Sequence, residues 1–154
     1  MLPKSHIILG AIFSTILIYF FNFSLIAGII IFLSSVFIDV DHYLYYVYKK
    51  KDWSLWKAYK WWMQGNKKLI ELDRKQRNEF AHGFAFLHGF EMLAILAVLG
   101  KMISIYFYYI LIGISFHLFL DLIHQRTIHD RLDKYSIIYD WIKYKKMRFL
   151  EELF

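Results

Sequence analysis

Histidines and aspartates gather at the ends of apolar stretches of this sequence, at spacings that suit a metal ion. The segment "IDVDH" at 38–42 closes one apolar run with two carboxylates and an imidazole. The segment "HLFLDLIH" at 117–124 closes another, and its His, Asp and His lie four and three positions apart. That spacing puts all three side chains on one face of a helix. Both segments therefore predict a site that binds a cation.

Further ionisable residues lie near the start of the chain and at the beginning of another apolar run. In "HGFE" at 88–91, the His and the Glu lie three positions apart, on one face of a predicted helix. Ionisable groups at membrane depth are costly and usually functional. We therefore expect these residues to converge on one site. The predicted metal ligands are His6, Asp39, Asp41, His42, His82, His88, His117, Asp121 and His124.

The types of ligand narrow the choice of metal. The chain has no cysteine, which excludes thiolate sites and disulfides. Imidazoles mixed with carboxylates suit Zn²⁺ best, with Mn²⁺ or Fe²⁺ as alternatives. The candidates outnumber the four ligands of one zinc ion, so roughly one to three ions are expected. Asp121 is the best candidate for a bridging carboxylate, and Asp41 and Glu91 are the candidate general bases.

Four long apolar runs must position these residues. The chain is 58% hydrophobic, whereas a soluble domain is about 45–50% apolar, and each run approaches the ~20 residues that cross a bilayer. We expect one all-α domain, residues 1–154, built as a four-helix transmembrane bundle. A strongly apolar soluble domain is the alternative. The predicted membrane helices cover about residues 5–21, 24–46, 82–100 and 102–125.

The basic residues predict the topology. Ten Lys and Arg fall in residues 49–80 and seven follow residue 125, whereas the turn near Asn22 has none and the turn near Gly100 has only Lys101. Basic loops stay in the cytoplasm. We therefore expect a multi-pass protein of the cell membrane. Both termini, the long loop and all the polar clusters would then lie on the cytoplasmic side.

Two basic segments rich in aromatic residues, about 53–64 and 135–150, have the pattern of helices that lie in the lipid headgroup region. Packing against the helical bundle is the alternative for both. Contact with membrane lipid also explains the net charge of +6, so no nucleic-acid partner is expected. The membrane itself is the predicted partner.

The pattern resembles the membrane-bound, metal-dependent hydrolases that are also described as LexA-binding, inner-membrane-associated hydrolases. That family has a His near the N-terminus, P-D-[IVL]-D-H ending the second helix, H-R-x-x-x-H-S opening the third and H-x-x-x-D in a later helix. This chain departs from it at Ile38, Gly83 and Gly89, where the family has Pro, His and Ser. The likeness covers residues 1 to about 125. The matching residues are His6, Asp39, Asp41, His42, His88, His117 and Asp121.

This resemblance implies a metal-dependent hydrolase, and a more distant similarity to zinc-dependent phospholipase C and the P1-type nucleases implies that it cleaves phosphoesters. A site at the membrane surface suggests a phospholipid or a lipid-linked phosphoester as the substrate. The alternative is a non-catalytic membrane protein that binds a structural metal, senses a metal or transports one. Membrane di-iron oxidases are disfavoured, because the chain has no H-x-x-H-H segment.

Overall fold

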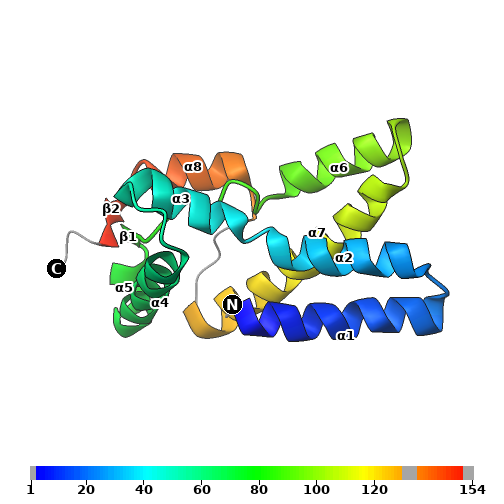
Figure 1. Cartoon of the computed structure of the whole chain (residues 1–154). Helices are drawn as coiled ribbons and strands as arrows, with labels where there is room; N and C mark the ends of the chain where they lie inside the picture. Colours follow the sequence, from blue (N-terminus) through cyan, green and yellow to red (C-terminus); the bar gives the residue numbers. More distant parts are fainter. Residues whose placement is uncertain (1–2, 130–134, 151–154) are drawn as a thin grey trace.

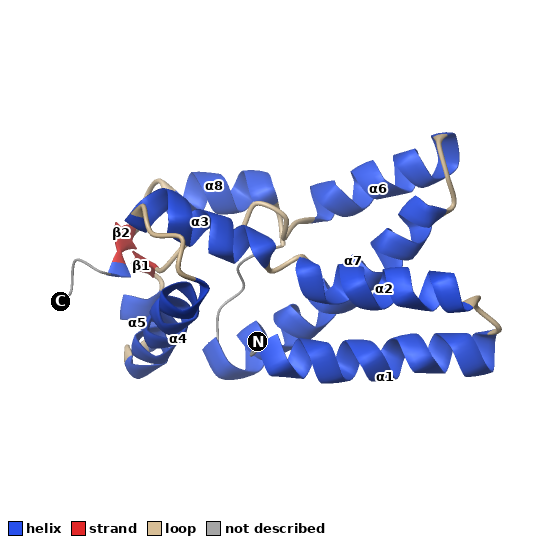
Figure 2. Ribbon diagram, viewed as in Figure 1, coloured by secondary structure: helices blue, strands red, loops and turns tan. Residues whose placement is uncertain are grey.

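The chain is almost wholly helical in the computed structural model, which describes residues 3–129 and 135–150 (Figures 1 and 2). The predicted all-α class is confirmed at this level. A short parallel pair of strands, β1 (Phe80–Ala81) and β2 (Arg148–Phe149), was not predicted. The helices are α1 (Pro3–Phe21), α2 (Leu25–Phe37), α3 (Val40–Lys50), α4 (Leu55–Glu71), α5 (Arg74–Arg77), α6 (Phe90–Met102), α7 (Tyr106–His124) and α8 (Ile137–Tyr144), and a π-helical turn, Gln125–His129, extends α7.

Three helical stretches are long and apolar enough to cross a membrane: Pro3–Phe21, Leu25–Lys50 and Tyr106–Ile128. Helix α6 has 13 residues and is therefore about 20 Å long, short of the ~30 Å of a hydrocarbon core. The coarse prediction of a membrane protein therefore holds, whereas a fourth helix of spanning length is not found among the described residues. Four spanning helices stay a prediction.

The hairpins α1–α2 and α6–α7 extend in the same direction, and α3, α4, α5 and α8 gather at the opposite end (Figure 1). Helices α1, α2 and α7 pack on one another, and α6 packs against α7. Small residues permit the close approach of α2 and α7. A Cβ atom at Gly113 would lie only 2.3 Å from the carbonyl oxygen of Ile31. Such small-residue contacts are typical of helices packed inside a membrane.

One predicted helix is interrupted, and the start of another is wrong. The helix expected over 24–46 is interrupted, because α2 ends at Phe37 and α3 begins at Val40. The helix expected over 82–100 begins only at Phe90. Residues 82–89 do not form a helix, and Gly89 is fully extended (φ −160°, ψ 156°). The amide of Leu87 donates to a side chain, Asp41 Oδ2 at 2.9 Å, instead of to a helical carbonyl. Tertiary hydrogen bonds have therefore replaced local ones.

Helices do form in both predicted amphipathic segments. Helix α4 contains most of 53–64 and continues to Glu71, and α8 lies within 135–150. Ser54 caps α4 through its hydroxyl, which accepts from the amide of Lys57 at 3.4 Å, and Ser136 caps α8 in the same way. Whether these helices touch lipid stays a prediction.

Single cysteines can test the topology, because the chain has none of its own. We expect a membrane-impermeant thiol reagent to label Phe21→Cys and Lys101→Cys from outside intact cells, since both lie near the hairpin turns. Lys67→Cys on α4 should react only after lysis. Phe21 is preferred to Asn22, whose φ of 56° disfavours cysteine. Labelling of Lys67→Cys alone from outside would reverse the orientation.

Candidate metal centre

Four separate parts of the chain bring polar side chains to one buried place between the α1–α2 and α6–α7 hairpins and the helices α3, α4 and α8. They are the first turns of α1, the turn between α2 and α3, the segment that precedes α6, and the second half of α7. Groups of three that are close enough to share an ion include most of the predicted ligands. These are His6, Asp39, Asp41, His42, His88, His117 and Asp121.

The centre of this cluster is a pair of facing imidazoles. His88 Nδ1 lies 3.0 Å from Asp41 Oδ2, and His117 Nδ1 lies 2.8 Å from the carbonyl oxygen of Ser35. Both partners are acceptors, so each Nδ1 carries the proton, and the Nε2 atom of a neutral ring is left with a lone pair. The two Nε2 atoms lie only 3.2 Å apart, and both rings are fully buried. This is the arrangement of histidines that bind a metal.

Two carboxylates complete the set around these nitrogens. Asp39 Oδ1 lies 3.4 Å from His88 Nε2 and 3.5 Å from His117 Nε2. Asp121 Oδ2 lies 3.9 Å and 3.7 Å from the same two atoms. A tetrahedral zinc ion with bonds of about 2.0–2.1 Å places its ligand atoms roughly 3.3 Å apart. The ligand atoms of Asp39, His88 and His117 therefore have separations that suit one divalent ion, and Asp121 lies slightly farther away.

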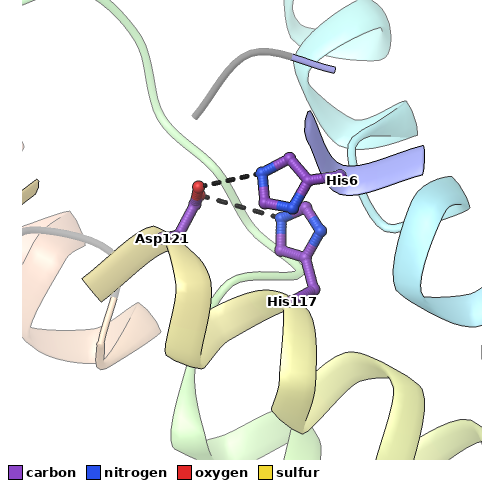
Figure 3. Close-up of side chains that lie close together, drawn as sticks. All are labelled: His6, His117 and Asp121. Carbon is purple, nitrogen blue, oxygen red and sulfur yellow. Dashed lines mark hydrogen bonds and ion pairs between the residues drawn. The ribbon is translucent and has the colours of Figure 1, made fainter. Parts of the chain in front are cut away.

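Asp121 also faces His6 (Figure 3). Its Oδ1 atom lies 3.1 Å from His6 Nε2, while Oδ2 is turned towards His88 and His117. The His6 ring stacks on His117 with centroids 3.9 Å apart. The two oxygens of Asp121 thus face different imidazoles, which is the geometry that a bridging carboxylate needs. Its bridging role stays a prediction.

Asp41 and His42 lie on the other side of His88. Asp41 is fully buried, and its Oδ2 atom accepts from the amide of Leu87 as well as from His88 Nδ1. The His42 ring lies between two carboxylates, with Nδ1 3.0 Å from Asp41 Oδ1 and Nε2 3.5 Å from Asp39 Oδ1. Asp41 is placed to orient His88, and its remaining oxygen faces His42.

A cavity of about 280 Å³ opens beside the cluster. Asp39, His42 and Asp121 lie at its wall, and α4 and α8 close its other sides. Trp62 forms part of this wall: its indole N–H donates to the carbonyl oxygen of His42 at 2.8 Å, and its ring stacks on the His42 ring. Within the predicted interfacial segment 53–64, Trp53 and Trp56 are strongly exposed, whereas Trp62 lines the cavity.

The two other predicted ligands, His82 and His124, line the cavity. Among the described residues, neither belongs to a group that is close enough to share an ion. His82 packs between Trp61 and Trp62, with ring centroids 4.2 Å and 4.7 Å away. It also lies against Gly65, where a Cβ atom would come within 2.0 Å of the imidazole. His124 follows Asp121 by one turn and faces the cavity beyond it. Whether either histidine binds a metal stays a prediction.

Glu91 lies away from the cluster, and the prediction that it shares a helical face with His88 is wrong, because α6 starts at Phe90. Its carboxylate instead holds the start of α8. Ser136 Oγ donates to Oε1 at 2.6 Å, and the amide of Ile137 donates to Oε2 at 2.9 Å. No local pattern links residue 91 to residue 136, so the sequence offered no signal for this contact.

Comparisons of the chain with models of protein families, with curated proteins and with solved structures find no match.

Removing a central ligand tests the site directly. We expect His88→Ala to lose bound zinc, because it removes a nitrogen that faces the other ligands, and Asp41→Asn to weaken zinc binding roughly 10–100-fold by freeing the His88 ring. His124→Ala is the matched control and should keep full metal content. Elemental analysis and competition with a chelating dye measure both quantities. Metal loss in His124→Ala but not in His88→Ala would contradict this ligand set.

Glu91→Ala separates an anchoring role from a catalytic one. We expect it to lower the stability of α8 by about 1–2 kcal/mol, the usual effect of losing a helix cap. Amide hydrogen exchange of residues 137–144 should then be faster, while metal content stays unchanged. Glu71→Ala, at an exposed glutamate of α4, is the control. Metal loss in Glu91→Ala with unchanged exchange would restore Glu91 as a ligand.

Proposed function

We propose that this protein is a membrane-bound, metal-dependent hydrolase of phosphoesters, as its resemblance to the LexA-binding, inner-membrane-associated hydrolases implies. The observation that carries the proposal is the pair of buried imidazoles, His88 and His117, whose Nε2 atoms face each other at 3.2 Å beside two carboxylates and a cavity. Two lone pairs at that distance repel each other unless a cation or a proton lies near them. A divalent cation between the two rings would accept a lone pair from each Nε2 atom.

The residues that would hold this ion are Asp39, His88 and His117, which leaves one position for water. Asp121 and His6 would be available to a second ion. Zn²⁺ is the best candidate, and Mn²⁺ or Fe²⁺ are alternatives. When bound in such a site, the ion lowers the pKa of a water molecule towards about 7 and neutralises charge on a phosphoryl oxygen.

The chain's own groups would position the substrate and handle protons. Asp41 holds the tautomer and the direction of the His88 ring. His42 is half-buried at the cavity wall and lies within 3.5 Å of two carboxylates, so we assign it the transfer of a proton to or from the bound phosphoester. Asp41 was predicted as the general base, but its occupied Oδ2 atom favours the orienting role.

The location of the cavity supports a lipid or lipid-linked substrate. Its lining includes residues of the α2–α3 turn, α4, α7 and α8, so a phosphoester at the membrane surface would reach Asp39 and Asp121 from the interface. Lysines of α4 and α8 favour anionic headgroups near the surface. The proposed location is the inner membrane, with the site on the cytoplasmic side.

The experiment compares metal content with hydrolysis. Protein reconstituted with zinc should hydrolyse bis(p-nitrophenyl) phosphate or a member of a phospholipid panel, and both chelation and His117→Ala should lower the rate to that of metal-free protein. Lys75→Ala, at an exposed residue of α5, is the control.

A protein that binds zinc stoichiometrically, yet hydrolyses nothing on the panel, would instead favour a non-catalytic metal-binding protein. A structural metal fills all of its coordination positions with protein ligands, whereas a catalytic one keeps a position for water. Exchangeable water on the bound ion, measured with a paramagnetic substitute such as Mn²⁺, separates these two cases.

A further inference from the structure

Helix α8 has its polar and apolar faces reversed with respect to a helix on the surface of a soluble protein. Its outward residues include Ile138, Trp141 and Ile142, which are 64%, 50% and 47% exposed. Its inward residues include Asp140 and Lys143, which line the cavity. A surface helix in water normally buries its apolar stripe and exposes its charges. The reversed pattern indicates that something apolar covers the outer face.

The structure fastens this helix at both ends. At its start, Glu91 accepts from Ser136 and Ile137, and the amide of Phe90 donates to the carbonyl oxygen of Tyr135 at 2.9 Å. After its end, β2 pairs with β1, and the amide of Arg148 donates to the carbonyl oxygen of Glu79 at 2.9 Å. These contacts at both ends fix the orientation of α8, so its apolar face points outward.

The outer face of α8 begins beside apolar surface at the start of α6. Phe86 and Phe90 are 39% and 54% exposed there, and a Cβ atom at Gly89 would lie 2.6 Å from Ile137. Apolar surface thus continues from the membrane hairpin onto α8. At the far end of α8, Lys145 Nζ lies 3.6 Å above the Trp141 ring. Tryptophan beside lysine is typical of the headgroup layer, where an indole is half-immersed and an ammonium group meets phosphate.

We propose that the outer face of α8 docks on the lipid headgroup layer, and that this docking holds the cavity wall in place over the candidate metal centre. The wall contributes Asp140, Lys143 and Tyr144 to the cavity, and the Tyr144 ring packs against Phe84 from the opposite side. Contact with lipid would therefore shape the cavity that receives the substrate. The regulatory part of this proposal rests on the proposed function, whereas the docking does not.

The docking is tested in vesicles of phosphatidylcholine and phosphatidylglycerol. An environment-sensitive fluorophore on Ile142→Cys should shift to the blue, and a spin label at the headgroup level should quench it more than aqueous iodide does. The same fluorophore on Lys75→Cys, on the polar helix α5, is the control and should respond mainly to iodide. Equal iodide access at both positions would overturn the docking.

The link between docking and the cavity is tested with a second cysteine. Met147→Cys lies on the cavity wall and should react slowly with a water-soluble maleimide in vesicles. Adding Ile142→Asp should raise the labelling rate about tenfold, because the outer face then loses apolar contact with lipid, whereas Ile142→Leu should leave it unchanged. An unchanged rate in Ile142→Asp would overturn the link.

These measurements do not require hydrolysis, so they separate the two proposals. Docked fluorophore and slow maleimide labelling in a protein without phosphoesterase activity would leave the docking in place and remove the hydrolase. A protein that hydrolyses phosphoesters, but whose fluorophore at position 142 is quenched by iodide, would keep the hydrolase proposal and remove the docking.

Discussion

The buried contact between His88 and His117 is the constraint on which the rest of the site depends. Their Nε2 atoms lie 3.2 Å apart, and neither ring is exposed to water. Each ring is held from behind by an acceptor, Asp41 for one and the Ser35 carbonyl for the other. Two lone pairs that face each other are unfavourable by themselves. A cation bound between the two rings and the neighbouring carboxylates can compensate for this repulsion.

Two departures from regular helix make this contact geometrically possible. Because the helix is interrupted between α2 and α3, Asp39 faces the Nε2 atoms of the two imidazoles, while Asp41 contacts the Nδ1 atom of His88. The non-helical segment before α6 carries His88 to the centre and gives Asp41 the amide of Leu87. A continuous helix through either segment would rotate successive side chains by about 100° and separate these groups.

The same cluster lies at the boundary between two kinds of packing. On one side, small residues such as Gly113 let α2 and α7 approach closely, as membrane helices do. On the other side, aromatic residues of α4 and α8 enclose a cavity, with Trp62 joined to the backbone of His42. The metal centre we propose therefore faces both the apolar hairpins and a space that can admit a polar group.

The sequence by itself indicated the helical class, the apolar stretches and most of the residues of the candidate site, because spacing along a chain decides which residues share a helix face. It therefore placed His117 and Asp121 on one face of α7. Only the tertiary structure decided where the helices end and which side chains orient the histidines through hydrogen bonds, as Asp41 orients His88. His82 and Glu91 show the limit: His82 packs against two indoles and Glu91 holds the start of α8, and both contacts join segments that are remote in sequence. Contacts between distant segments depend on how the whole chain packs, and no local period in the sequence encodes them.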